Sequence, residues 1–102
     1  MADSKKTLTP TEIADAALAD WQLDGETLTA RYATGDFATG LELVSRIGAS
    51  AEAANHHPDL TLTYPEVTVA LTSHDVGGIT ARDLKLARAI GEHAAQLGIT
   101  AS

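Results

Sequence analysis

The chain of 102 residues contains no cysteine, which excludes disulfide bonds, thiolate catalysis and cysteine-ligated metals. Aromatic residues make up only 4% of the chain, so leucine, isoleucine, valine and alanine must fill the interior. Positive charge is also scarce, because 7 Lys and Arg stand against 14 Asp and Glu and give a formal net charge of −7. Proteins that bind nucleic acid or anionic membranes directly normally carry a basic patch, and this balance argues against both.

No apolar run approaches the length that crosses a membrane. The first six residues carry no apolar stretch behind their lysines, so we expect no secretory signal and a soluble cytoplasmic protein. The length suits one domain, and we expect a disordered tail over residues 1–7 followed by a single domain over residues 8–102. A domain of this size buries a smaller fraction of its surface than a larger domain does, which favours a homo-oligomer.

Caps and apolar spacing predict three helices. The first spans about residues 9–20, where Thr9 and Glu12 can form a capping box around a proline at the first helical position. The second runs from a cap at Asp36 to about residue 55. Its apolar stripe advances in steps of three and four and consists of Phe37, Leu41, Val44, Ile47, Gly48 and Ala51.

The third helix carries the clearest signals. Thr80 can cap it, Asp83 completes a capping box three residues later, and Gly98 is a natural stop. Four short stretches between the helices have the character of strands, and an Asp-Gly turn joins the first two, residues 21–23 and 28–33. This order of elements predicts an α+β domain whose antiparallel sheet needs helices over one face.

The second hairpin has a register that burial should fix. Three pairs place all its apolar side chains on one face: Tyr64 with Val67, Leu62 with Val69, and Leu60 with Leu71. Extended outward, this register brings His57 opposite His74. We therefore expect these two histidines to lie close together, pointing away from the apolar face.

Three of the four histidines, His56, His57 and His74, belong to this cluster. An imidazole donates and accepts protons near neutral pH, so such a cluster favours acid–base chemistry or metal binding. Three histidines can hold zinc with one open position, although His56 and His57 would point to opposite sides of an extended segment. The fourth, His93, lies near the end of the third helix, where we interpret it as structural.

These residues and their neighbours resemble the signature of the pterin-4a-carbinolamine dehydratase family. The pattern consists of an acidic residue, three spacers, a His-His-Pro triplet, an aromatic residue, a further histidine and a later aspartate. The residues that meet it are Glu52, His56, His57, Pro58, Tyr64, His74 and Asp83. The resemblance covers about residues 8–98. Many members of the family carry Trp at or beside the position of Leu60, and Thr at the position of Ser73. These two differences bear on how a pterin would pack in the site.

The resemblance implies a four-stranded antiparallel sheet with three helices packed on one face, in the order α-β-β-α-β-β-α, assembled as a homo-dimer or homo-tetramer. It also implies a lyase of tetrahydrobiopterin recycling. Such a dehydratase eliminates water from the 4a-hydroxytetrahydrobiopterin that aromatic amino-acid hydroxylases release, and gives quinonoid dihydrobiopterin. The resemblance implies neither a metal nor a cofactor.

The roles of individual residues follow from the same resemblance. His56, His57 and His74 are the expected catalytic set, because an acid must protonate the leaving hydroxyl and a base must take the proton from N5. Their division into acid and base stays open, and His56 alternatively orients the pterin. The residues expected to bind substrate are Glu52, Asp59, Ser73 and Asp75. Those expected to shape the motif are Pro58, Gly78 and Asp83, with Asp83 acting as a cap. The competing function is a non-catalytic assembly or dimerisation partner on the same fold.

Overall fold

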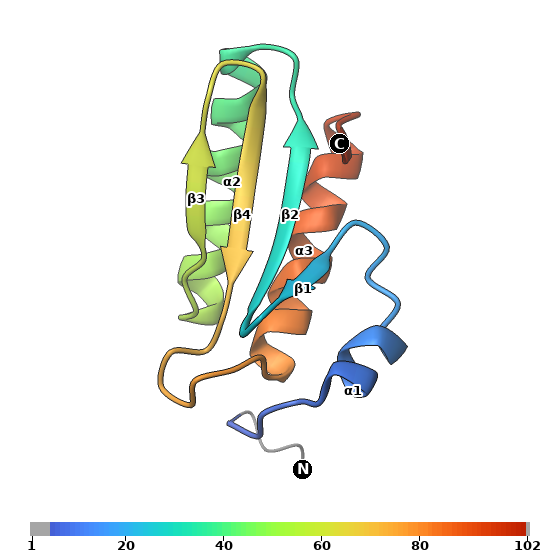
Figure 1. The fold of residues 1–102 in the computed structure, drawn as a ribbon. Coiled ribbons are helices and arrows are strands. Elements are labelled where there is room, and N and C mark those ends of the chain that lie inside the picture. The colour runs from blue at the N-terminus through green and yellow to red at the C-terminus, as the bar shows by residue number, and fades with distance from the viewer. Residues whose placement is uncertain (1–4, 102) are drawn as a thin grey trace.

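The computed structural model describes residues 5–101, which form an α+β domain with an antiparallel sheet (Figure 1). The helices are α1 (Pro10–Asp15), α2 (Phe37–Ala54) and α3 (Ala81–Gln96). The strands are β1 (Gln22–Asp24), β2 (Thr27–Ala33), β3 (Asp59–Leu62), β4 (Glu66–Leu71) and β5 (Thr100–Ala101). The long helices α2 and α3 run side by side behind the sheet, while α1 lies near β1 and adds Ile13 to the core. The predicted fold class and order of the first seven elements are confirmed.

The sheet has five strands where the sequence predicted four. Its order is β1-β2-β4-β3, and β5 pairs with the end of β2, with Thr100 opposite Ala33. Strands β1 and β5 therefore share one edge of β2, whereas β3 forms the opposite edge of the sheet. The additional strand is two residues long, which is too short for a period of two to appear in the sequence.

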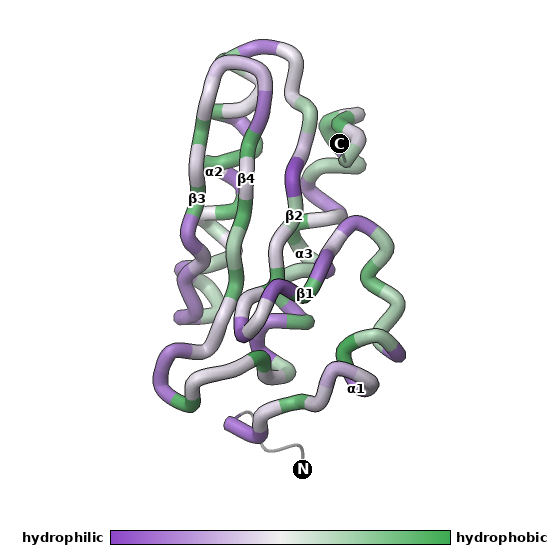
Figure 2. The backbone as a smooth tube through the Cα atoms, viewed as in Figure 1, coloured by the Kyte–Doolittle hydropathy of each residue, from purple (hydrophilic) through white to green (hydrophobic). Residues whose placement is uncertain are grey.

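One face of the sheet forms the core. Buried side chains alternate with more exposed ones along β2 and β4. Figure 2 colours the residues of these strands by their hydropathy. The buried members of these two strands are Leu28, Ala30, Tyr32, Val67, Val69 and Leu71. The core is therefore built mainly from aliphatic side chains, with one tyrosine.

The predicted register of the second hairpin is wrong by two residues. Leu62 pairs with Val67 and Leu60 pairs with Val69, because a tight turn around Pro65 closes where the Thr63 N–H donates to the Glu66 carbonyl at 3.0 Å. A shift of two residues keeps every side chain on its own face, so the predicted apolar face survives.

The same shift has two further consequences. Tyr64 lies in the turn, 67% exposed, rather than at the end of a strand. The ladder ends where Asp59 pairs with Ala70, so strand pairing does not place His57 opposite His74.

The first helix is shorter than predicted. The capping box of Thr9 and Glu12 is confirmed, but α1 ends at Asp15 and Ala17 takes a positive φ of 54°. A left-handed residue cannot continue a right-handed helix, which explains why the helix stops before residue 20. Within the predicted tail, Lys6 Nζ lies 3.8 Å from the Glu12 carboxylate, and residues 1–4 lie outside the described residues.

The buried face of α2 is rotated from the predicted stripe. It consists of Gly40, Leu43, Ile47 and Ala51, whereas Phe37 and Leu41 are 47% and 50% exposed. The helix approaches the sheet closely at Gly40, where a β-carbon would lie 2.7 Å from Leu62 Cδ1. The small residue thus selects the face that packs on the sheet.

The third helix agrees with its signals. Thr80 and Asp83 form the capping box, Gly98 has a φ of 71°, and the Ile99 N–H bonds the Ala94 carbonyl at 2.9 Å beyond the helix end. The residues that α3 buries are Asp83, Leu86, Ala87, Ile90 and Ala94.

Candidate active site

The His-His-Pro segment begins where α2 ends. Asn55 caps the helix in the left-handed region, with φ 49° and ψ 42°, and the His56 N–H bonds the Ala51 carbonyl at 3.1 Å. Asparagine tolerates this conformation better than most residues. After this turn His56 is buried, at 9% exposure, whereas the His57 side chain is 56% exposed. Adjacent histidines therefore have different environments.

His56 is anchored by a buried carboxylate. Its Nε2 lies 2.6 Å from Asp83 Oδ1, and Asp83 is fully buried in the first turn of α3. Asp83 Oδ2 accepts a hydrogen bond from the Ser73 hydroxyl at 2.8 Å and another from the Thr80 N–H at 2.9 Å. A buried carboxylate needs this degree of hydrogen bonding. In the neutral tautomer that donates from Nε2 to Asp83, His56 keeps Nδ1 as a proton acceptor.

His57 pairs with a different carboxylate. Its Nε2 is hydrogen-bonded to Glu52 Oε2 from the last turn of α2, and both side chains are largely exposed. An exposed pair of this kind orients the imidazole and leaves it open to solvent and ligands. Glu52, expected to bind substrate, here contacts a histidine.

His74 lies in a tight loop over residues 73–78. Ser73 and Gly78 close this loop through a bridge, with the Ser73 N–H bonded to the Gly78 carbonyl at 2.9 Å, and Gly77 takes a φ of 67°. Gly78 lies close to the N-terminal segment, since a β-carbon there would stand 3.2 Å from Thr7 Cγ2. His74 itself is exposed and follows Ser73 directly.

An ion pair connects this loop to the first turn of α3. Asp75 Oδ1 accepts a hydrogen bond from Arg82 Nη2 at 2.8 Å, and this bond lowers the pKa of the Asp75 carboxyl. Asp75 was expected to bind substrate, and its carboxylate is engaged with Arg82 instead.

Two other expected substrate ligands occupy contrasting positions. The Ser73 hydroxyl is buried and bonded to Asp83 and to Thr80 Oγ1, the latter at 2.9 Å. Asp59 begins β3 and stays exposed, after a half-buried Pro58.

The structure thus brings His56, Asp83 and Ser73 into one network and leaves His57 and His74 exposed, each directly after one of its members. Sequence reasoning missed the contributions of Thr80 and Arg82 to this site. The capping box at residues 80–83 pointed to Thr80 as a cap, but nothing in the sequence indicated its bond to Ser73.

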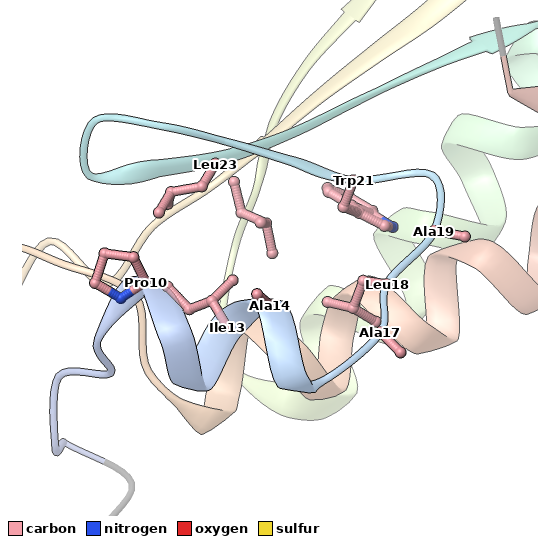
Figure 3. A pocket seen from close by; sticks show the side chains of 9 residues that line it. Pro10, Ile13, Ala14, Ala17, Leu18, Ala19, Trp21 and Leu23 are labelled. Carbon is pink, nitrogen blue, oxygen red and sulfur yellow. The ribbon is translucent and has the colours of Figure 1, made fainter.

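The surface of the described residues has several grooves, and two of them have the larger volumes. An apolar groove of about 470 Å³ separates α1 from the segment leading to β1, and Figure 3 shows Ile13, Leu18 and Trp21 around it. A second, of about 500 Å³, lies between α2 and α3 and is bordered by His56, and we call it the α2–α3 groove. Within residues 5–101 no group of three or more His, Asp or Glu side chains is placed to hold a metal. No helix in this range is long and apolar enough to span a bilayer.

The fold and the anchored histidine segment define the class of protein. A solved structure from Brucella melitensis, described as a transcriptional coactivator/pterin dehydratase, superposes with a TM-score of 0.82 at 34% identity. The match covers 87% of this chain and 99% of the other.

The chain belongs to the pterin 4 alpha carbinolamine dehydratase family, whose model matches residues 6–93. A protein of Koribacter versatilis with the provisional name pterin-4-alpha-carbinolamine dehydratase is 42% identical over 89 residues, which are 85% of this chain and 95% of its own. A pterin dehydratase-like protein identified as a RuBisCO assembly factor in the alpha-carboxysome shares the fold, with a TM-score of 0.51 at 20% identity over 76% of this chain and 84% of its own.

Proposed function

We propose that this protein is a 4a-hydroxytetrahydrobiopterin dehydratase that works by histidine acid–base catalysis. The carbon–oxygen bond at C4a breaks, the N5 proton goes to a base, and the hydroxyl leaves as water after an acid protonates it. The observation that carries the proposal is the difference between two adjacent imidazoles. His56 is buried on Asp83 with 2.6 Å between the bonded atoms, and His57 is exposed beside Glu52. Sites that need an acid and a base commonly place like groups in unlike environments.

We assign proton exchange with the pterin to His57 and His74, and the orienting role to His56. The support comes from hydrogen bonds that join two segments, and not from strand pairing. Asp83 joins His56 to Ser73 by hydrogen bonds, and the residue that follows each of these two is an exposed histidine. We propose that these two linked segments present their solvent-accessible imidazoles to one bound pterin.

The assay is the dehydration of synthetic 4a-hydroxytetrahydrobiopterin, followed by absorbance against the buffer rate. His57→Ala and His74→Ala should each lower the rate by about 10²-fold or more, the usual contribution of a proton-transfer group. Both side chains are exposed, so thermal unfolding should change little. His93→Ala, which removes a histidine bonded to Ser50 on α2, is the control and should retain the rate. A parent protein with no turnover above buffer would overturn the dehydratase assignment.

The same proposal covers the partners and setting of the enzyme. The substrate is a pterin supplied by a hydroxylase of aromatic amino acids, the reaction needs neither a metal nor another cofactor, and the enzyme acts in cytoplasmic tetrahydrobiopterin recycling. We also propose a homo-dimer or homo-tetramer, because α2 exposes Phe37 and Leu41 along its outer side.

A second candidate function is an assembly partner without catalysis. The fold it shares with the RuBisCO assembly factor favours this alternative. The retained histidines and their two carboxylate partners favour the enzyme. The dehydration assay separates the two, because an assembly partner would show no turnover.

A further inference from the structure

The α2–α3 groove has an unusual charge for this acidic protein. Two of its lining residues, Arg82 and Lys85, are basic, and none of the lining residues within the described part of the chain is acidic. The chain as a whole has twice as many acidic as basic residues. Small side chains, among them Ala53 and Ala89, face each other across the groove and leave space that longer side chains would fill.

The two cations stand on one face of α3, three residues apart, in its first turns. Arg82 is held in place by Asp75 at Nη2 and by Thr80 Oγ1 at Nε, at 2.8 and 3.3 Å, and its Nη1 makes no hydrogen bond within residues 5–101. Lys85 is exposed and has no partner in that range. The N-terminal end of the helix macrodipole adds positive potential at the same place.

The opposite wall offers a hydroxyl donor. Ser50 Oγ lies 2.7 Å from His93 Nε2, and His93 Nδ1 is buried without a hydrogen-bond partner among the described residues. In the tautomer that carries the ring proton on Nε2, His93 donates to Ser50 Oγ. The hydroxyl hydrogen of Ser50 is then free to point into the groove.

We propose that the α2–α3 groove binds a phosphate group. Besides His56, its polar lining consists of the guanidinium of Arg82, the ammonium of Lys85 and the hydroxyl of Ser50, which suit a ligand that has only acceptors and a double negative charge. The phosphate group either belongs to the side chain of a pterin bound at His56 or is a separate anion. The first source rests on the proposed function, whereas the second does not.

Binding measured by calorimetry separates these sources. The ligands are 7,8-dihydroneopterin, its side-chain monophosphate, and inorganic phosphate. We expect the monophosphate to bind about five- to tenfold more tightly than the neutral pterin, a gain that falls as salt is raised. Lys85→Gln should remove most of the gain and Lys85→Arg should retain it. Lys6→Gln, a basic residue outside the groove that pairs with Glu12, should change nothing.

Each outcome has a definite meaning. A Lys85-dependent gain for the phosphorylated pterin places the phosphate on the substrate. Equal binding of both pterins, with Lys85-dependent binding of inorganic phosphate, identifies a separate anion. If neither the monophosphate nor inorganic phosphate binds in a Lys85-dependent way, the groove is not a phosphate site. The dehydratase assignment is judged separately, by turnover of the neutral substrate.

Discussion

The carboxyl group of Asp83 serves both the helix and the candidate site. One oxygen completes the cap of α3 through the Thr80 N–H, and the other holds His56 at 2.6 Å. The capping role could be predicted from the spacing of Thr80 and Asp83 alone. The hydrogen bond between Asp83 and His56 could not be predicted, because these residues are 27 positions apart and only the packed fold brings them together.

Replacing Asp83 with asparagine should reveal both roles. The amide keeps the size but loses one acceptor oxygen, so we expect the free energy of unfolding to fall by about 1–3 kcal/mol. An amide N–H facing His56 Nε2 should move the ring proton to Nδ1 and slow dehydration. Nitrogen-15 NMR of the imidazole measures the tautomer, and thermal unfolding measures stability. An unchanged tautomer together with an unchanged rate would contradict the positioning role of Asp83.

The environment of Tyr32 predicts how the stability of the protein changes in alkali. Burial, with a smaller contribution from the charge of Asp20, raises the pKa of the Tyr32 hydroxyl from 10.0 to about 12. Below pH 10 the hydroxyl is protonated in both the folded and the unfolded chain. Between pH 10 and 12 the unfolded chain loses the proton first, so stability should fall as pH rises through this window.

Thermal unfolding from pH 8 to 12 tests this expectation. Tyr32→Phe should flatten the alkaline decline in unfolding temperature, although the change alters the core. Tyr64→Phe removes the other tyrosine, which is 67% exposed, and should leave the decline intact. Equal pH profiles for Tyr32→Phe and the parent would argue against the raised pKa.

At the scale of single elements, the N-terminal starts of the helices were more predictable than helix faces. Local side chains form the caps at Thr9, Asp36 and Thr80, and local sequence therefore reveals them. The face of α2 depends on how closely the helix approaches the sheet at Gly40, which is a property of the tertiary fold. The hairpin register depended in the same way on the turn that Pro65 adopts, not on the apolar pattern.

Three helical glycines give a graded test of that packing. At Gly48 and Gly91 a β-carbon would meet nothing within 4 Å, so alanine should stabilise the protein by about 0.5–1 kcal/mol at each position. At Gly40 the β-carbon would lie 2.7 Å from Leu62 Cδ1 and 3.3 Å from Thr34 Oγ1, so the gain should be absent or reversed. Thermal unfolding compares the variants. A Gly40→Ala protein as stable as Gly48→Ala would show that α2 has room to move away from the sheet.

At the scale of the whole molecule, the class and the order of the seven main elements followed from the sequence. The additional strand β5 did not, because its two residues pair with β2 through backbone hydrogen bonds that carry no side-chain signal. The spacing of the residues reveals a motif, so the members of the candidate site could be named from the sequence. The assignment of Ser73 and Asp75 to the substrate did not anticipate their internal partners, which spacing alone cannot identify.

The exposed side of α2 predicts self-association. Leu41 is 50% exposed beside Phe37 at 47%, and burial of such side chains between copies is favourable. Size-exclusion chromatography with light scattering should give a mass that is a multiple of 10.6 kDa, and Leu41→Lys should lower it. Leu23→Lys, which changes an exposed leucine in β1, should leave the mass unchanged. A parent protein that runs as a monomer at micromolar concentration would refute the assembly.

The left-handed turn at Asn55 separates two side chains of identical chemistry. The sign of one backbone angle sends the first imidazole into the protein interior and leaves the second facing water. A β-branched residue at this position would strongly disfavour the angle, so the two rings would lose their distinct surroundings even with both histidines still in place. In a homologue, the residue just before the two adjacent histidines is therefore as informative as the histidines themselves about whether the two rings have different roles.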